Sequence, residues 1–230
     1  MAKILIKFPT RDRPNMFFNV LNTYIKYLSK KHDVEFLVTC DTDDPSMNNP
    51  NSIQKLNSYT NLKYFFGNNK NKIEAVNADM EKASDFDFLL LASDDMIPQM
   101  HGYDNIIFEN FQKFFPDFDG VLWFNDGLVG KALNTLSIMG KKYYNRFNYI
   151  YNPIYKSYYC DGEFTIIANA LKKQIYIDTV IIKHFHVSHG LAVKDNLFNK
   201  NYKYWEEDQN TFFNRRDRLL AIKTIEDFTF

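Results

Sequence analysis

The 230-residue sequence has little cysteine, no long hydrophobic run and no excess of charge of either sign. Its two cysteines, Cys40 and Cys160, show neither metal-site spacing nor a disulfide-scaffold pattern. No apolar run approaches the ~18 residues that a membrane span needs. The sequence therefore argues against a disulfide-stapled scaffold and against an integral membrane protein.

Charge is balanced, with 28 Lys and Arg against 28 Asp and Glu. Binding to duplex nucleic acid depends largely on neutralising phosphates, so a neutral chain does not resemble a strongly basic nucleic-acid binder, although a local basic cleft stays possible. The N-terminus, Met1-Ala2-Lys3, leads at once into a predicted strand, unlike a signal peptide. Together with the sparse cysteines, these features predict a cytoplasmic protein.

Composition is that of one globular domain. Hydrophobic residues make up 45% and charged residues 24% of the chain, which has no repeat, low-complexity tract or clear linker. The aromatic share is 17%, which favours a Phe-rich core, although some exposed tyrosines could line a ligand site. We expect residues 1–230 to form a single domain.

Short apolar runs alternate with helical patterns in the first half of the chain. The predicted strands cover residues 4–8, 34–39, 62–66 and 86–92, and the predicted helices begin at Pro14 and cover 72–83. This alternation is typical of βαβ units and a mostly parallel sheet. The second half is less regular: it predicts helices over 103–115, 164–171 and 204–220, and strands over 120–124, 134–139, 175–177 and 180–185.

Polar residues follow each of the first three predicted strands, at the sheet edge where open α/β folds bind ligands. Thr10, Arg11 and Arg13 follow the first strand and suit a phosphate or a base edge, or a solvated turn. Two other groups are equally open: Asp41 and Asp43 fit either ribose contacts or a turn, and Lys72 fits either a diphosphate at a helix start or a polar cap.

The sharpest feature follows the fourth strand, where a buried apolar run leads directly into Ser93-Asp94-Asp95. Adjacent carboxylates repel each other unless positive charge lies between them, and a hard cation such as Mg²⁺ or Mn²⁺ supplies it. The alternative is a helix cap, which the nearby Pro98 makes less attractive.

Two further groups lie later in the chain. Asp161 and Glu163 precede or open a predicted helix, where a plain N-terminal cap explains them as well as catalysis does. His184 and His186 alternate along a predicted strand, with His189 close by, and imidazole is a common metal ligand, although such histidines are often structural.

Taken in order, these groups resemble the motifs of GT-A glycosyltransferases of the broad family 2 type, over about residues 3 to 190. The usual Asp-x-Asp motif has Ser93 at its first position here, which cannot supply a charge. The matching residues are Thr10, Arg11, Arg13, Asp41, Asp43, Lys72, Ser93, Asp94, Asp95, Asp161, Gly162, Glu163, His184, Phe185 and His186.

The resemblance implies a GT-A fold, with a mostly parallel central sheet flanked by helices, and a nucleotide-diphosphate sugar donor held with Mn²⁺ or Mg²⁺. It implies a nucleotide-binding half over 1–100, an acceptor half over 101–190 and a C-terminal helical segment over 191–230. Asp95 would bind the metal, Asp94 would assist it or hold the ribose, and His184 or His186 would complete the metal shell.

The resemblance also implies the remaining roles. Asp41 and Asp43 would face the nucleoside, and Thr10, Arg11 and Lys72 the base and diphosphate, with Arg13 and Ser93 beside them. In an inverting reaction, a carboxylate deprotonates the acceptor hydroxyl; Asp161 is the first choice for this base and Glu163 the second.

The predicted function is therefore sugar transfer to an acceptor hydroxyl on a carbohydrate, glycolipid, protein or small molecule, with a modified nucleobase of DNA as a less favoured acceptor. A nucleotidyltransferase is the first alternative, but the loop from Pro9 to Pro14 has no glycine. A non-catalytic binding protein on the same fold is the second.

Overall fold

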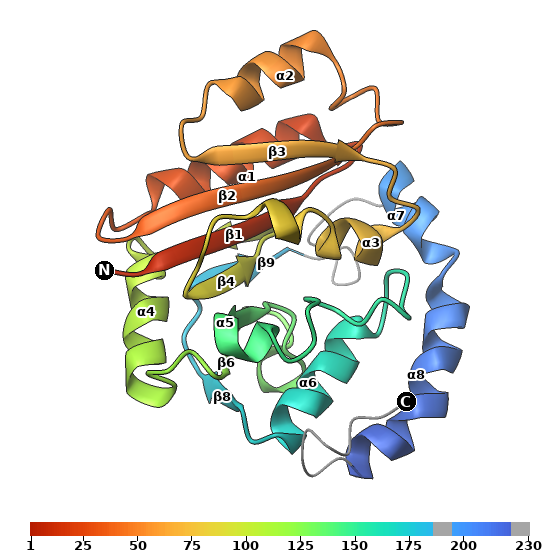
Figure 1. The fold of residues 1–230 in the computed structure, drawn as a ribbon. Coiled ribbons are helices and arrows are strands. Elements are labelled where there is room, and N and C mark those ends of the chain that lie inside the picture. The colour runs from red at the N-terminus through yellow and green to blue at the C-terminus, as the bar shows by residue number, and fades with distance from the viewer. Residues whose placement is uncertain (186–194, 222–230) are drawn as a thin grey trace.

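The computed structural model describes residues 1–185 and 195–221, which form a seven-stranded sheet with helices on both faces and a small second sheet (Figure 1). The strands are β1 (Lys3–Pro9), β2 (Asp33–Asp41), β3 (Leu62–Gly67), β4 (Phe88–Leu91), β5 (Met96–Pro98), β6 (Val121–Phe124), β7 (Ile138–Gly140), β8 (Gln174–Ile177) and β9 (Ile182–His184). The helices are α1 (Pro14–Lys26), α2 (Pro50–Asn57), α3 (Lys72–Asn77), α4 (Tyr103–Phe114), α5 (Lys141–Tyr144), α6 (Cys160–Ala170), α7 (Asn196–Tyr202) and α8 (Trp205–Ala221), with short 3₁₀ turns η1 (Met80–Lys82) and η2 (Gly130–Ala132).

The large sheet has the order β3-β2-β1-β4-β7-β6-β8. Strands β1, β2, β3 and β4 are mutually parallel, whereas β7 runs antiparallel to both β4 and β6, and β8 is parallel to β6. This confirms the predicted mostly parallel α/β sheet. The carboxyl ends of β1, β2 and β4 consequently meet at one edge, where ligands bind in such sheets.

Strand β4 shows why the sheet lies at the centre of the molecule. All four of its residues are buried, and they alternate between two cores. Phe88 and Leu90 belong to a core shared with α1 and α4, whereas Leu89 and Leu91 belong to one shared with α3 and α6. A strand that is apolar on both faces needs a helical layer on each side, and the fold supplies both.

Several boundaries differ from the predictions for local reasons. The predicted helix over 72–83 divides because Asp79 has a left-handed backbone (φ 63°), so α3 ends at Asn77 and η1 follows. Helix α2 and strand β5 were not predicted. Asn49 accepts hydrogen bonds from the amides of Asn51 and Ser52 at the start of α2. No helix in the described ranges is both long enough and apolar enough to cross a bilayer.

A lysine lies fully buried in the middle of the sheet. The Lys7 ammonium donates hydrogen bonds to Thr39 Oγ1 and, at 2.8 Å, to the carbonyl oxygen of Ala78. Thr39 in turn donates to Asp79 Oδ2 at 2.6 Å. Burial disfavours the charged ammonium and lowers the pKa of Lys7 to about 8, although the Asp79 carboxylate opposes this effect.

Because of Lys7, the free energy of unfolding should change with pH in the alkaline range. Below pH 8 both the folded and unfolded chains hold the Lys7 proton, but between pH 8 and 10.5 the folded chain releases it while the unfolded chain keeps it. We predict that the free energy of unfolding of the wild type, relative to that of Lys7→Met, rises by roughly 3 kcal/mol across this range. Urea unfolding of both proteins from pH 7 to 10.5 measures it, and a difference that stays flat with pH would contradict the assignment.

Candidate functional site

The candidate site lies at the carboxyl edge of the large sheet. The loops after β1, β2 and β4 begin at this edge, and β9, α3 and α6 contribute the remaining predicted site residues. Helix α7 lies near this edge in Figure 1. The predicted site residues that fall in the described ranges come from these segments, but their partners divide them into separate groups.

Arg11 holds the first group together. Its guanidinium donates to Asp41 Oδ2 at 2.7 Å and to both oxygens of Asp43 at 2.6 and 2.9 Å. The hydrogen bond from Arg11 lowers the pKa of the exposed Asp43 carboxyl. Asn69 donates to the other oxygen of Asp41 at 2.8 Å. The buried Thr10 hydroxyl has no hydrogen-bond partner among the described residues.

Arg13 joins the site to the C-terminal segment. It donates to Asp94 Oδ1 at 3.0 Å and, through two nitrogens, to Asp195 at 2.5 and 2.9 Å. Asp195 also caps α7 by accepting from the amide of Phe198. Burial raises the pKa of Asp94 to about 6, while Arg13 favours its ionised form. In this structure Arg13 therefore pairs with two carboxylates, those of Asp94 and Asp195.

Asp95 faces a histidine from a distant part of the sequence. Residues 96–98 of β5 pair antiparallel with β9, with Met96 opposite His184, and the Phe185 amide donates to the carbonyl oxygen of Asp95 at 2.8 Å. This pairing brings Nε2 of His184 to 3.6 Å from Oδ2 of Asp95. Ser93 donates to Oδ1 of Asp95 at 2.6 Å, so the serine at the first motif position orients the carboxylate.

The imidazole of His184 lies between two carboxylates. Its Nδ1 is 3.7 Å from Oδ2 of Asp126, a residue that sequence reasoning did not select. Burial alone would lower the pKa of His184, but Asp126 and Asp95 raise it to about 9. Burial alone would raise the pKa of Asp95, but His184 and Ser93 hold it well below the usual value. His186 lies outside the described residues.

Lys72 and Asp161 lie close enough to influence the same charges. Burial raises the pKa of Asp161, and the Lys72 ammonium is the largest influence opposing it. Lys72 also lowers the pKa of Asp95, and His184 that of Asp161. Asp95, His184, Lys72 and Asp161 therefore lie within range of one another's charges.

Glu163 has a different environment from Asp161, although both are in the first turn of α6. It is 1% exposed and accepts from Asn152 at 2.6 Å, from Tyr155 at 2.7 Å and from Arg215 of α8 at 2.9 and 3.0 Å. These bonds occupy both carboxylate oxygens, so they favour a structural role for Glu163 over the predicted one as a base.

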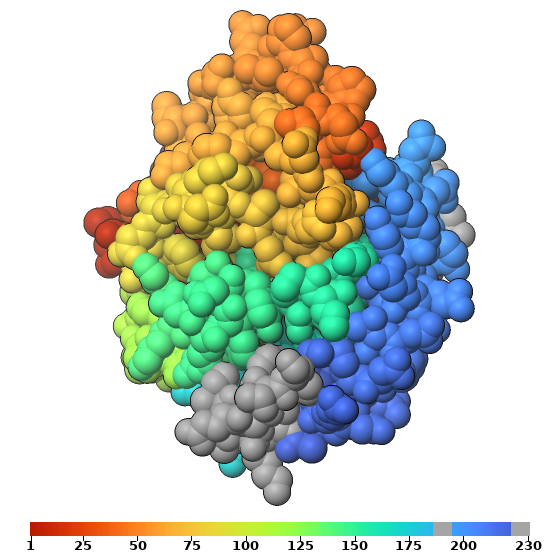
Figure 2. Space-filling view, turned by 45° about the vertical axis from the view of Figure 1, so that its right-hand side comes forward, coloured from red at the N-terminus to blue at the C-terminus, as the bar shows by residue number. Residues whose placement is uncertain are grey.

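Helix α8 contacts the loop that precedes α6. Asp208 is fully buried and accepts from the amides of Lys156, Ser157 and Tyr158 at 2.8 to 2.9 Å. In Figure 2 the blue surface of α7 and α8 lies against the green segment that precedes α6. The helix therefore fixes the loop from which α6 and Asp161 begin.

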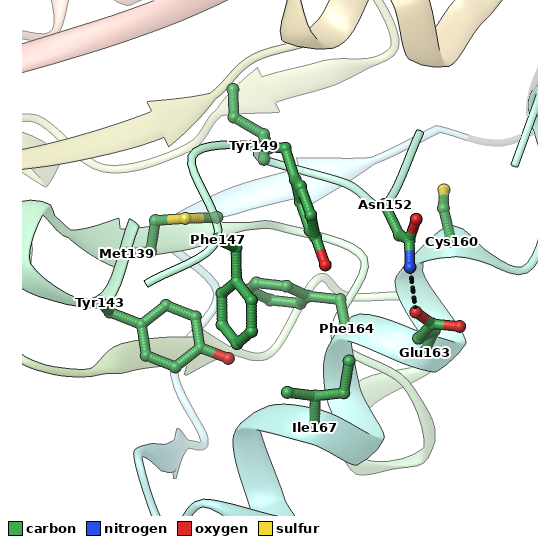
Figure 3. Close-up of a pocket in the computed structure, with 10 residues that line it drawn as sticks. Met139, Tyr143, Phe147, Tyr149, Asn152, Cys160, Glu163, Phe164 and Ile167 are labelled. Atoms are coloured by element: carbon green, nitrogen blue, oxygen red, sulfur yellow. Dashed lines mark hydrogen bonds between the residues drawn. The ribbon is translucent and has the colours of Figure 1, made fainter. Parts of the chain in front are cut away.

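A small cavity of about 20 Å³ is lined by residues of α5, α6 and the segment between them, and none of the predicted metal ligands in the described ranges lines it. Figure 3 shows the rings of Phe147, Tyr149 and Phe164 gathered around it, with Glu163 bonded to Asn152 at its side. Its lining is mostly aromatic and aliphatic, which fits a packing space of the core next to α6.

A divalent cation fits the pair of Asp95 and His184. Ligands about 2.0–2.2 Å from one shared ion lie roughly 3–4 Å apart, and the two ligand atoms here are 3.6 Å apart. Within residues 1–185 and 195–221, no three His, Cys, Asp or Glu side chains are grouped so that they could hold a metal alone. Further ligands would thus come from a bound diphosphate, from water, or from outside the described ranges.

Comparison with solved structures identifies the fold. The chain is similar to a mannosyltransferase from Pyrobaculum calidifontis in complex with GDP-Man and Mn²⁺ (TM-score 0.64, 12% identity), over 96% of this chain and 63% of that chain. It is similar to TarS from S. aureus in complex with UDP-GlcNAc (TM-score 0.63, 15% identity), over 96% of this chain and 71% of that chain. A mutant galactosyltransferase from Drosophila with manganese, UDP-Gal and xylobiose matches at TM-score 0.52 and 14% identity, over 85% and 77%.

These similarities confirm the predicted GT-A-like glycosyltransferase fold. The chain spans less than two thirds of the length of the mannosyltransferase. No protein-family model and no curated protein sequence matches it.

The pairing of Glu163 with Arg215 predicts a stability effect. Removing the guanidinium leaves the Glu163 carboxylate buried without its charge partner, so Arg215→Met is expected to lower the free energy of unfolding by about 3–5 kcal/mol. Arg216→Met is the control, because the Arg216 side chain is 46% exposed and contacts Asp217 and the Phe213 ring of its own helix, and it should cost less than about 0.5 kcal/mol. Urea unfolding measures both; equal effects would show that the buried pair does not fix α8 onto α6.

Proposed function

We propose that this protein transfers a sugar from a nucleotide-diphosphate sugar to an acceptor hydroxyl with the help of a divalent cation. The observation that carries the proposal is the approach of Asp95 to His184 at 3.6 Å, beyond the end of β4 in a GT-A-like fold. Lys72 adds positive charge at the start of α3, where it would face the diphosphate.

In this proposal, residues 1–100 bind the donor and residues 101–190 the acceptor. The nucleoside lies against Thr10, Arg11, Asp41 and Asp43, and the Arg11 guanidinium already binds both of these carboxylates. UDP- and GDP-sugars are the donors to test first, because structurally similar proteins have been solved with UDP-GlcNAc, UDP-Gal and GDP-Man.

Asp161 is the proposed base. Its pKa is raised by burial, and a carboxylate with a raised pKa is a better proton acceptor for an acceptor hydroxyl. The hydroxyl oxygen then bonds to the anomeric carbon as the bond to the diphosphate breaks, which inverts the configuration in one displacement. Lys72 stabilises the charge that develops on the leaving diphosphate, and a Mn²⁺ or Mg²⁺ ion at Asp95 and His184 would supply Lewis-acid stabilisation of the same group.

The acceptor is proposed as a hydroxyl-bearing carbohydrate, glycolipid, protein, small molecule or modified nucleobase. We also propose a cytoplasmic location, which the two buried free cysteines support.

The donor assignment predicts metal-dependent binding at Asp95. In thermal-shift and calorimetric titrations with UDP- and GDP-sugars, Mn²⁺ should strengthen binding to the wild type, and Asp95→Asn should remove most of that gain because it removes a charged ligand of the ion. Asp117→Asn is the control, since Asp117 is exposed and pairs with Lys142 away from the site. Mn²⁺-dependent binding that survives Asp95→Asn would refute this site.

A second experiment distinguishes the roles of the two acidic residues of α6, Asp161 and Glu163. Asp161→Asn should lower turnover by about 100- to 10,000-fold with donor binding and stability retained, because it removes the proton acceptor. Glu163→Gln should lower stability through the lost ion pair with Arg215 and affect turnover far less. Steady-state rates and melting temperatures of both variants decide it, and the reverse pattern would assign the base to Glu163.

A further inference from the structure

Asp126 follows β6 and is 2% exposed, yet its carboxylate has a complete set of partners. Oδ1 accepts hydrogen bonds from three successive backbone amides, those of Leu128 at 3.0 Å, Val129 at 2.9 Å and Gly130 at 3.0 Å. Thr135 donates to Oδ2 at 2.7 Å. Three amides on one oxygen fix the plane of the carboxylate, so the direction of Oδ2 is fixed as well.

The fixed Oδ2 atom faces the imidazole of His184. Its distance to Nδ1 is 3.7 Å, so a small rotation of the ring completes a hydrogen bond from Nδ1–H. The backbone holds the two residues together independently, because the His184 amide donates to the carbonyl oxygen of Asp126 at 2.9 Å. The opposite ring nitrogen, Nε2, is the one that faces Asp95.

We propose that Asp126 is a positioning residue: it holds one proton of His184 on Nδ1, so that the proton released to solvent when a cation binds at Asp95 is the one on Nε2, whose lone pair then faces the cation. A carboxylate that accepts from the far nitrogen of a metal-binding histidine sets both the tautomer and the ring orientation. The inference rests on the proposed function for the presence of the cation, but it concerns residues that touch neither donor nor acceptor.

Asp126→Asn is the sharpest test because the geometry dictates how the amide must lie. The three backbone amides need an acceptor, so the Asn oxygen takes the place of Oδ1 and its NH₂ group takes the place of Oδ2. That NH₂ group donates to Nδ1 of His184, which moves the ring proton to Nε2 and blocks metal binding. Mn²⁺ affinity, measured from the electron paramagnetic resonance signal of free Mn²⁺ with UDP or GDP present, should fall by about 10- to 100-fold.

Two comparisons separate this role from general damage to the loop. Asp178→Asn changes a neighbouring, exposed carboxylate that accepts from Asn125, and it should leave Mn²⁺ affinity unchanged. In a His184→Ala background, adding Asp126→Asn should cause no further loss, because Asp126 acts through the imidazole. A further loss in that background, or wild-type affinity in Asp126→Asn alone, would overturn the proposal.

A measurement on the wild type keeps the test decisive if Asp126→Asn does not fold. With Zn²⁺ as a diamagnetic substitute, long-range ¹H–¹⁵N correlation spectra should show His184 protonated at Nδ1 and metal-bound at Nε2; a proton retained at Nε2 would overturn the inference. The wild type's failure to bind Mn²⁺ or Zn²⁺ would overturn it too. If Asp126→Asn weakens Mn²⁺ binding as expected but the wild type neither binds nor consumes a nucleotide sugar, the proposed function fails and the role of Asp126 stands. If the wild type transfers a sugar but Asp126→Asn binds Mn²⁺ as tightly as the wild type, the role of Asp126 fails and the proposed function stands.

Discussion

The contact between Asp95 and His184 joins two segments that are nearly ninety positions apart in the sequence, and much of the site depends on it. It exists because β5 and β9 pair as a separate two-stranded sheet next to the end of β4. A carboxylate this close to the core carries a desolvation cost, which a facing imidazole, a serine hydroxyl and a nearby ammonium offset. The same arrangement offers an oxygen and a nitrogen ligand to a divalent cation.

Each of two arginines near this contact forms ion pairs with two carboxylates. Arg11 serves the carboxylates after β2, and Arg13 serves the one after β4. Arg13 also binds Asp195, so the N-terminal loop and the C-terminal segment are held by one guanidinium. Together with Asp208, which caps the loop before α6, this makes α7 and α8 supports of the site instead of an appended tail.

The sequence was sufficient for what depends on local pattern. The apolar run of β4, the proline at the start of α1 and the polar strand ends predicted the parallel sheet and the edge at which the site lies. Alternation of buried side chains along a strand is a property of neighbouring residues, and so is the preference for proline in a first helical turn. The GT-A fold was expected from a family resemblance of the motifs, in their order along the chain.

Contacts between residues far apart in the chain could not be predicted from the sequence. Nothing near Asp126, Asp195 or Asp208 in the sequence indicates the histidine, arginine and amides that they bind, because those partners lie between about fifty and one hundred and eighty positions away. Glu163 and Asp161 read alike as acidic residues at a helix start, and only the position of Arg215 separates them. The distinct roles of such residues are set by tertiary contacts, which local propensity does not encode.

The most direct test of the account is a crystal structure of the protein with Mn²⁺ and UDP or GDP, with data collected at a wavelength that gives manganese anomalous signal. The account predicts one strong anomalous peak within coordination distance of Asp95 and of Nε2 of His184, bridging to the diphosphate. A bound nucleotide whose manganese lies elsewhere, or a diphosphate bound while Asp95 and His184 remain in contact with each other and without an ion, would contradict it.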